Sequence, residues 1–250
     1  FIVMGGMFVG WYRVPPASQM GDGVDAARDW WTNWRSYAGL APVKFLRPSR
    51  YAGSGVVVDE RAEVQPGVTL MTGLWSSEVG LTLRDLDGKE LHRWHAAFSK
   101  LWPETPQLAA ADMPANDWDT HLHGAVLYPN GDVVFNFDFT GLIRLDRCSR
   151  VVWRLPYRTH HSLMVDDDGD LWAVGIKAEH AEASTRFPGL EPPFREDTIV
   201  HVAAEDGRIL REISMLDVLY GSGYEGALLT GGLRVRPGLR DPDPLHTNQA

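Results

Sequence analysis

The chain has 250 residues and a formal net charge of −9 at pH 7, so it is acidic and long enough to bury a substantial core. This charge argues against broad nucleic-acid binding, which needs clustered Lys and Arg. Its single cysteine, Cys148, excludes an internal disulfide framework and is compatible with any cellular compartment.

The chain begins with a short apolar run, FIVMGGMFVG, followed by Trp11, Tyr12 and Arg13. This run is shorter than the roughly 20 apolar residues that cross a bilayer. An aromatic pair followed by Arg and two prolines is nevertheless typical of the end of a membrane helix. We therefore interpret residues 1–14 as the end of an N-terminal anchor, which predicts that the rest of the chain lies on the periplasmic or extracytoplasmic face. A buried N-terminal strand or helix is the alternative.

A helix is predicted over residues 22–38, inside a linking segment that covers residues 15–55. Asp22 can cap this helix and Gly39 can end it. Aromatic side chains recur along it at three- and four-residue spacing and form one face, which consists of Trp30, Trp34 and Tyr37. This face either packs on the main domain or lies at a membrane surface or on an integral membrane complex.

From Val56 onward, short β-rich runs alternate with Gly, Asn and Asp turns, which indicates an all-β domain over residues 56–250. An internal repeat is visible because three segments align without gaps, with their turn aspartates about 60 residues apart. These segments are LDGKELHRW (86–94), LDRCSRVVW (145–153) and EDGRILREI (205–213). Each is expected to form the outer hairpin of its repeat.

An inner hairpin is expected to turn at Asn130-Gly131-Asp132 in one repeat and at Asp168-Gly169-Asp170 in the next. Four antiparallel strands per repeat at this period are typical of a β-propeller. About three repeats are visible, with a fourth starting near His246, so this chain is expected to hold three to four blades of a longer propeller. The repeats are Val56–Trp94, His123–Leu155 and His161–Ile213.

Two Pro-containing insertions interrupt the repeats, at Phe98–Asp119 and at Ile176–Asp197. Long loops of this kind tend to be functional or to cover another part of the protein.

A histidine precedes each inner hairpin at the same position, because His123 and His161 both lie seven residues before the turn. The corresponding end of a propeller's inner strand faces the central channel. We therefore expect these imidazoles to converge, together with His246. Converging imidazoles bind an oxyanion when protonated or a transition metal when neutral. Capping of the inner strands by hydrogen bonds, without chemistry, is the alternative.

Metal binding is a weaker interpretation of these residues. His121 and His123 have the spacing of a metal pair on one strand face, and with His161 they would suit a metal-dependent hydrolase. No cysteine or acidic ligand stands at a matching spacing, however. The acidic run 166–170 lacks the glutamate of a calcium loop and is better explained as a hairpin turn. No metal or other cofactor is therefore expected.

Three segments together resemble the arylsulfotransferase family: RLDRCSRVVWRLPY (144–157), THHSLMVDDDGDLWAVG (159–175) and DPLHTN (243–248). In that family a Thr-His-His segment precedes an inner strand, and an Asp-x-x-His-x-Asn segment follows one blade later. The resemblance covers roughly Val56 to the end. The order of anchor, helix and propeller also resembles membrane-attached members of the family.

The resemblance implies a six-bladed propeller that moves a sulfuryl group between phenols through a sulfohistidine. Carried over by position, His161 or its neighbour His160 corresponds to a sulfate-binding residue. His246 is the histidine of the second motif and is flanked by Asp243 and Asn248. His160, His161 and His246 are thus the catalytic candidates, whereas His123, Asp243 and Asn248 are candidates for substrate binding.

The sequence departs from the family in two places. The family's arginine and nucleophilic histidine follow the second motif, whereas this sequence ends two residues beyond Asn248. Ser162 also stands where the family has Asp after Thr-His-His. A second hypothesis therefore stays open: a non-catalytic propeller that serves as an accessory or scaffold subunit of a respiratory or photosynthetic membrane complex.

Overall fold

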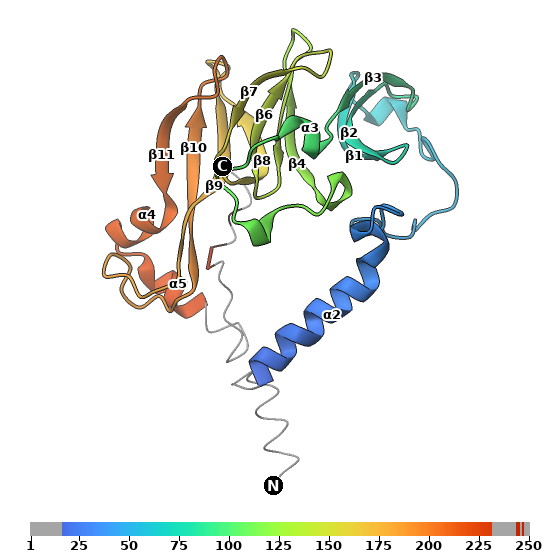
Figure 1. The fold of residues 1–250 in the computed structure, drawn as a ribbon. Helices are drawn as coiled ribbons and strands as arrows, with labels where there is room; N and C mark the ends of the chain where they lie inside the picture. The colour runs from blue at the N-terminus through green and yellow to red at the C-terminus, as the bar shows by residue number, and fades with distance from the viewer. Residues whose placement is uncertain (1–16, 232–243, 246, 248–250) are drawn as a thin grey trace.

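The structure is a computed structural model that describes residues 17–231, 244, 245 and 247. The described chain is mostly β, with three antiparallel sheets and few helices (Figure 1). The first sheet has three strands in the order β1-β2-β3, and each of the other two has four. The first sheet consists of β1 (Thr69–Trp75), β2 (Glu78–Arg84) and β3 (Glu90–His95).

The second and third sheets are antiparallel meanders, in which each strand pairs with the next along the chain. The second consists of β4 (Leu122–Leu127), β5 (Val133–Phe137), β6 (Gly141–Leu145) and β7 (Val151–Leu155). The third consists of β8 (Thr159–Val165), β9 (Leu171–His180), β10 (Phe194–Val202) and β11 (Ile209–Ser214). These strands cover the predicted repeats that begin at His123 and His161.

Tight turns join the strands where the sequence predicts them. Gly131 and Gly169 adopt φ angles of 86° and 88° at the inner turns, a region that glycine enters at little steric cost. The carboxylate of Asp166 accepts hydrogen bonds from the backbone N–H groups of Asp168 and Asp170. The acidic run 166–170 therefore closes a hairpin through bonds between its own Asp166 carboxylate and its backbone.

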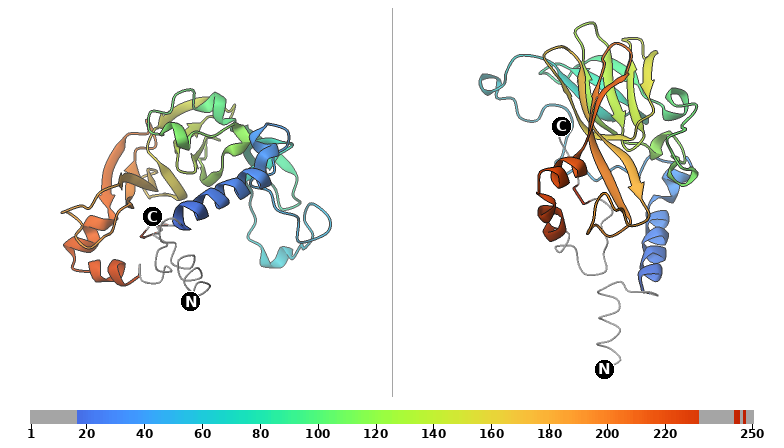
Figure 2. Two further views of the ribbon diagram at one scale, coloured as in Figure 1. Left: turned by 60° about the horizontal axis from the view of Figure 1, so that its bottom comes forward. Right: turned by 90° about the vertical axis from the view of Figure 1, so that its left-hand side faces the viewer.

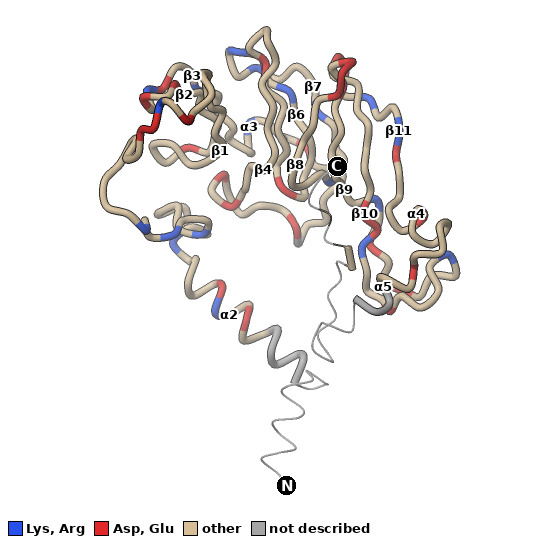
Figure 3. The backbone as a smooth tube through the Cα atoms, turned by 180° about the vertical axis from the view of Figure 1, so that it is seen from behind, with Lys and Arg blue, Asp and Glu red and all other residues tan. Residues whose placement is uncertain are grey.

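Figure 3 shows basic residues spread among acidic ones along the described chain.

The structure differs from the predicted insertion at Ile176–Asp197. Strand β9 continues to His180 and β10 begins at Phe194, so the irregular connection is shorter than the sequence indicated. The side chains of Ile176 and Phe194 are buried, which explains why both strands extend. The first repeat also differs, because its first strand begins at Thr69, after an exposed irregular segment that includes Val56.

Apolar side chains fill the spaces between neighbouring sheets. Leu81 and Trp94 of the first sheet share one buried cluster with Phe135 and Phe137 of the second. Val134 and Leu142 of the second sheet share another with residues of β9 and β10. The remaining helical elements connect or flank the sheets: η1 (Arg61–Glu63), α3 (Phe98–Leu101), η2 (Ala110–Asp112), η3 (Asp117–Asp119), α4 (Met215–Gly221) and α5 (Glu225–Gly231).

Helix α2 (Ala17–Tyr37) packs against η3. There the Asn116 side chain donates a hydrogen bond of 2.7 Å to the Ser36 carbonyl oxygen. The rest of α2 extends away from the sheets (Figures 1 and 2). The side chains of Trp30 and Trp31 are 59% and 76% exposed. Trp34 is 41% exposed and Tyr37 is partly buried at the C-terminal end, so the described residues leave Trp30 and Trp34 of the predicted aromatic face largely uncovered.

Among the described residues, no helix combines the length and the apolar character needed to span a bilayer. The predicted anchor at residues 1–14 lies outside the described residues.

Candidate functional site

Strands β4 and β8, the first strands of their sheets, lie against each other at Gly124 and His161. A Cβ atom on Gly124 would lie 2.4 Å from the His161 carbonyl oxygen, so only glycine permits this approach. The side chain of Asn136 on β5 donates a hydrogen bond of 2.9 Å to the same oxygen. The backbone around His161 is therefore fixed by the neighbouring sheet.

Both histidines of the repeated motif lie in β-bulges. His123 and Gly124 together face the single residue Asn136, because the β4–β5 register shifts between Leu122 and Ala125. The β8–β9 register also shifts, between His160 and Leu163, so His161 and Ser162 form a bulge between these two paired positions. Bulges redirect side chains and are over-represented next to active sites.

His161 also has an uncommon backbone conformation, with a φ angle of 56°. Non-glycine residues rarely adopt positive φ, and such residues cluster at functional sites. The conformation is held in place by the hydrogen bond from Asn136.

The side chains of His123 and His161 are in direct contact. The backbone N–H of His161 donates to Nδ1 of His123 at 3.0 Å, and the two Nδ1 atoms are also 3.0 Å apart. Because Nδ1 of His123 accepts a hydrogen bond, its proton must lie on Nε2 and the ring is neutral. We assign the proton between the two Nδ1 atoms to His161, which leaves the lone pair of a neutral His161 ring on the buried Nε2 atom.

The surroundings of His123 also favour its neutral form. Burial is the main cause that lowers the pKa of His123, and positive charge on His121 or His161 would lower it further. Asp138 acts in the opposite direction, with a carboxylate oxygen 3.5 Å from Nδ1 of His123. The net direction is downward, because burial outweighs this one carboxylate.

His121 and His160 extend the cluster on its two sides. The His121 ring lies 4.8 Å from that of His123 and stacks on Phe45, a residue of the segment after α2. His160 is only 1% exposed, and its ring stacks on Phe139 at 4.9 Å. The sequence motif thus places His121 on the exposed side of the cluster and His160 inside the protein.

A polar cavity of about 360 Å³ adjoins His121 and combines cationic with aromatic side chains. Arg158 and Arg195 both pair with Glu179, and the Arg195 guanidinium lies 5.3 Å from the centre of the Phe139 ring. Lys44 pairs with Asp119. The charged lining residues are three cations and three carboxylates, namely Lys44, Arg158, Arg195, Asp112, Asp119 and Asp138, and the aromatic ones include Phe45 and Phe139. The guanidinium groups and the rings are the parts of these walls that can contact an aromatic anion.

The second motif lies only partly within the described residues. Asp243, His246 and Asn248 are outside them. The backbone N–H of Thr247, however, donates a hydrogen bond of 3.1 Å to the buried carboxylate of Asp197 on β10. Leu245 packs with a buried cluster at the far end of the third sheet. The two described neighbours of His246 therefore lie against the sheet that carries His161.

The described residues include no group of three His, Cys, Asp or Glu side chains placed to hold a metal ion. His121, His123 and His161, which a metal-dependent hydrolase would use, are thus not arranged as a group of metal ligands. Sequence reasoning also missed several residues of the site, namely Lys44, Phe45, Asn136, Asp138, Phe139 and Arg195. Of the site's cationic residues, only Arg158 carries a sequence signal, since it directly precedes the Thr-His-His segment.

Comparisons with known proteins show only a distant structural likeness. No family model matches the chain, and no curated protein matches it. Similar structures include quinohemoprotein alcohol dehydrogenases from Pseudomonas putida HK5 and from Comamonas testosteroni, both at 13% identity and a TM-score of 0.36. The matches cover 60% and 64% of this chain but only 19% and 20% of those proteins. At this TM-score, the likeness supports no conclusion about the activity or cofactors of this chain.

Proposed function

We propose that the chain is part of a β-propeller on the extracytoplasmic face of a membrane, where it transfers a sulfuryl group from an aryl sulfate to a phenol. Support for the propeller comes from the two consecutive four-stranded meanders, whose first strands β4 and β8 lie against each other. Support for the reaction comes from the histidine cluster and from the cavity at His121, whose lining includes arginine and aromatic side chains.

The contact between His123 and His161 carries this proposal. With its Nδ1 proton directed at His123, a neutral His161 ring has its lone pair on Nε2, as a nitrogen nucleophile requires. Cationic groups near a transferring sulfuryl group stabilise the charge on its oxygens. Arg158 and Arg195 line the adjoining cavity and are the described candidates for this role. His160 and His246 complete the set of proposed catalytic residues.

The reaction would proceed in two steps. First, the nucleophilic histidine attacks sulfur, so that an N–S bond forms and the S–O bond to the donor phenol breaks. The resemblance gives His161 a sulfate-binding role, but among the described residues Nε2 of His161 is the candidate for this attack. The donor leaves as phenolate with the electron pair and takes up a proton. Second, the acceptor phenol's oxygen attacks sulfur and the N–S bond breaks. The electron pair returns to the imidazole, and the acceptor's proton passes to a base. His123, Asp243 and Asn248 are proposed to position these groups.

The direct test incubates the full-length protein with 4-nitrophenyl sulfate and phenol and follows release of 4-nitrophenol. We expect transfer that is lost in His161→Ala and in His246→Ala, and a sulfohistidine detectable by mass spectrometry. His95→Ala is the matched control, because His95 is exposed and lies on β3 outside the cluster. Absence of transfer by the unmodified protein would refute the proposed reaction.

A second function, an accessory or scaffold subunit of a membrane complex, is favoured by helix α2. Trp30 and Trp31 expose large apolar surfaces on a helix that packs against η3 near its C-terminal end. Such patches are typical of protein or membrane interfaces. We propose that integral membrane partners bind this face. Co-purification of such partners in stoichiometric amount, lost in the double variant Trp30→Ser/Trp31→Ser, would support this role. A detergent-extracted protein that is a monodisperse monomer would contradict it.

A further inference from the structure

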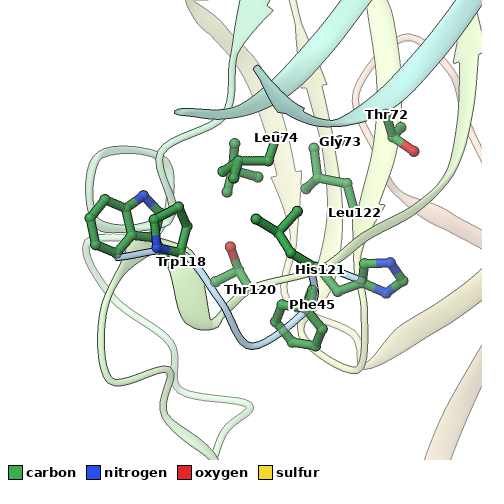
Figure 4. A pocket seen from close by; sticks show the side chains of 11 residues that line it. Phe45, Thr72, Gly73, Leu74, Trp118, Thr120, His121 and Leu122 are labelled. Atoms are coloured by element: carbon green, nitrogen blue, oxygen red, sulfur yellow. The ribbon is translucent and has the colours of Figure 1, made fainter. Parts of the chain in front are cut away.

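A second cavity, of about 220 Å³, lies where the first and second sheets meet. Leu74 on β1 and Leu122 on β4 line it from the two sheets (Figure 4). Trp118, just before β4, and Phe45, from the segment after α2, complete its walls (Figure 4). Among the residues that the structure describes, no Lys, Arg, Asp or Glu lines it, so it differs chemically from the polar cavity.

The size of this apolar pocket fits one aromatic ring. An apolar cavity of about 150 Å³ binds benzene, so 220 Å³ accommodates a ring with a small substituent. The indole of Trp118 is held in place, because its Nε1–H donates a hydrogen bond of 2.8 Å to the Ser77 carbonyl oxygen. The pocket therefore has a fixed aromatic wall against which a second ring can stack.

One end of the apolar pocket is polar. Figure 4 shows Trp118 on the left and the His121 ring and Thr72 on the right. The Thr120 hydroxyl, a third polar group of the lining, already donates to the Asp117 carbonyl oxygen at 2.7 Å. Thr72 and His121 can therefore donate to or accept from a hydroxyl on a bound ring, whereas Thr120 can only accept.

The apolar pocket and the polar cavity share the stacked pair of Phe45 and His121 as a wall. We propose that the apolar pocket binds the ring of an uncharged phenol, with its hydroxyl at the end formed by Thr72 and His121. The charged aryl sulfate is excluded from it, because no cation lines the pocket to offset the loss of hydration. That the bound phenol is the sulfuryl acceptor rests on the proposed function, whereas its binding does not.

Ligand-observed NMR with phenol, in the absence of any sulfate donor, tests the site in the full-length protein. We expect saturable binding that is tighter for phenol than for toluene, since toluene lacks the hydroxyl. Leu74→Phe fills the pocket and is expected to abolish binding. The matched control is Leu91→Phe, because Leu91 lies on β3 of the same sheet and does not line the pocket. Equal urea midpoints for the two variants would show that both fold.

Two surface variants separate the two cavities without risk to the core. Leu46 lines only the apolar pocket and Met113 only the polar cavity, and both are about half exposed. Leu46→Ala is expected to weaken phenol binding about threefold to fivefold, whereas Met113→Ala leaves it unchanged.

The site is refuted if phenol does not bind saturably, if Leu74→Phe binds it like the unmodified protein, or if toluene binds equally well. Phenol binding without sulfuryl transfer would refute the proposed function and leave this site standing. Sulfuryl transfer with an unchanged KM for phenol in Leu74→Phe would refute this site and leave the proposed function standing.

Discussion

The backbone N–H of His161 donates a hydrogen bond of 3.0 Å to Nδ1 of His123, so a histidine of one sheet caps the bulged strand of the next. This bond gives His123 a structural role, as expected if the histidines cap the inner strands. It also makes Nδ1 of His123 an acceptor, which assigns the proton of the Nδ1–Nδ1 contact to His161, as the proposed chemistry needs. The two roles are therefore compatible at this pair.

Replacing His123 by alanine is expected to destabilise the fold. The variant leaves the His161 N–H without its acceptor, which costs about 1–2 kcal/mol in the free energy of unfolding. His123→Asn is expected to restore most of this loss, because the amide oxygen occupies nearly the same place as Nδ1. Urea denaturation measures both. His95→Ala, at an exposed site, should change stability by less than about 0.5 kcal/mol. Equal losses for the alanine and asparagine variants would contradict the capping role.

The lowered pKa of His123 predicts a pH dependence of stability with a defined sign. The unfolded chain takes up a proton on this histidine near its ordinary pKa of 6.5, whereas burial of the ring lowers the pKa in the folded protein. The unfolded state thus binds more protons below pH 6.5, and stability falls as the pH drops from 6.5 to the folded-state pKa. Above pH 6.5 this contribution is constant.

The asparagine variant isolates this contribution, since it keeps an acceptor and cannot titrate. Urea midpoints at pH 8, 6.5 and 5 should decline less steeply for His123→Asn than for the unmodified protein. The other charged or titratable groups near the ring are Asp138, His121 and His161, and all are kept in this variant. Parallel declines in the two proteins would show that His123 stays uncharged in both states or titrates equally.

Gly124→Ala is expected to force β4 and β8 apart. The new Cβ would lie 2.4 Å from the His161 oxygen and 2.7 Å from the Leu163 nitrogen, and both are backbone atoms that cannot rotate away. Overpacking of this kind costs about 1–3 kcal/mol. Thermal unfolding measures the loss. Gly67→Ala is the control, because a Cβ there meets nothing within 4 Å. An unaffected Gly124→Ala protein would mean that the two strands do not approach as described.

The parts of the fold that the sequence predicts are those governed by local chemistry. The turn at Asn130-Gly131-Asp132 needs an Asn or Asp side chain and a glycine at positive φ, and both residues can be read from the sequence. The equivalent positions of His123 and His161 could be predicted because the whole strand-turn-strand unit recurs. The register of the bulges could not be predicted from the sequence, because it depends on which residue of the neighbouring strand faces each position.

The cavity residues carry no such signal. Lys44 and Arg195 lie far from the histidine motifs in sequence and meet them only through the packing of the sheets and of the segment after α2. The sequence also did not predict whether Trp30 is exposed or buried. Helical periodicity identifies an aromatic face but does not say whether the protein itself covers that face.

The buried carboxylate of Glu196 anchors the connection between β9 and β10. It accepts a hydrogen bond of 3.0 Å from Nε2 of His180, and Nη1 of Arg186 lies 3.4 Å from its other oxygen. Glu196 is 1% exposed, so these partners provide the compensation that a buried charge requires. Arg186 belongs to the connecting segment itself, which Glu196 therefore ties to the sheet.

Glu196→Ala is expected to release this segment, and limited trypsin digestion can detect the release because Arg186 is a cleavage site within it. Removing one partner of a fully buried ion pair costs about 3–5 kcal/mol, and the cost here should be smaller because Arg186 is half exposed. Cleavage after Arg186 should therefore become several-fold faster, with the sheets still folded by circular dichroism. Glu205→Ala, at an exposed turn of the same sheet, should digest like the unmodified protein. Unchanged cleavage in Glu196→Ala would show that the segment is held by its apolar contacts, led by Phe187, rather than by the carboxylate.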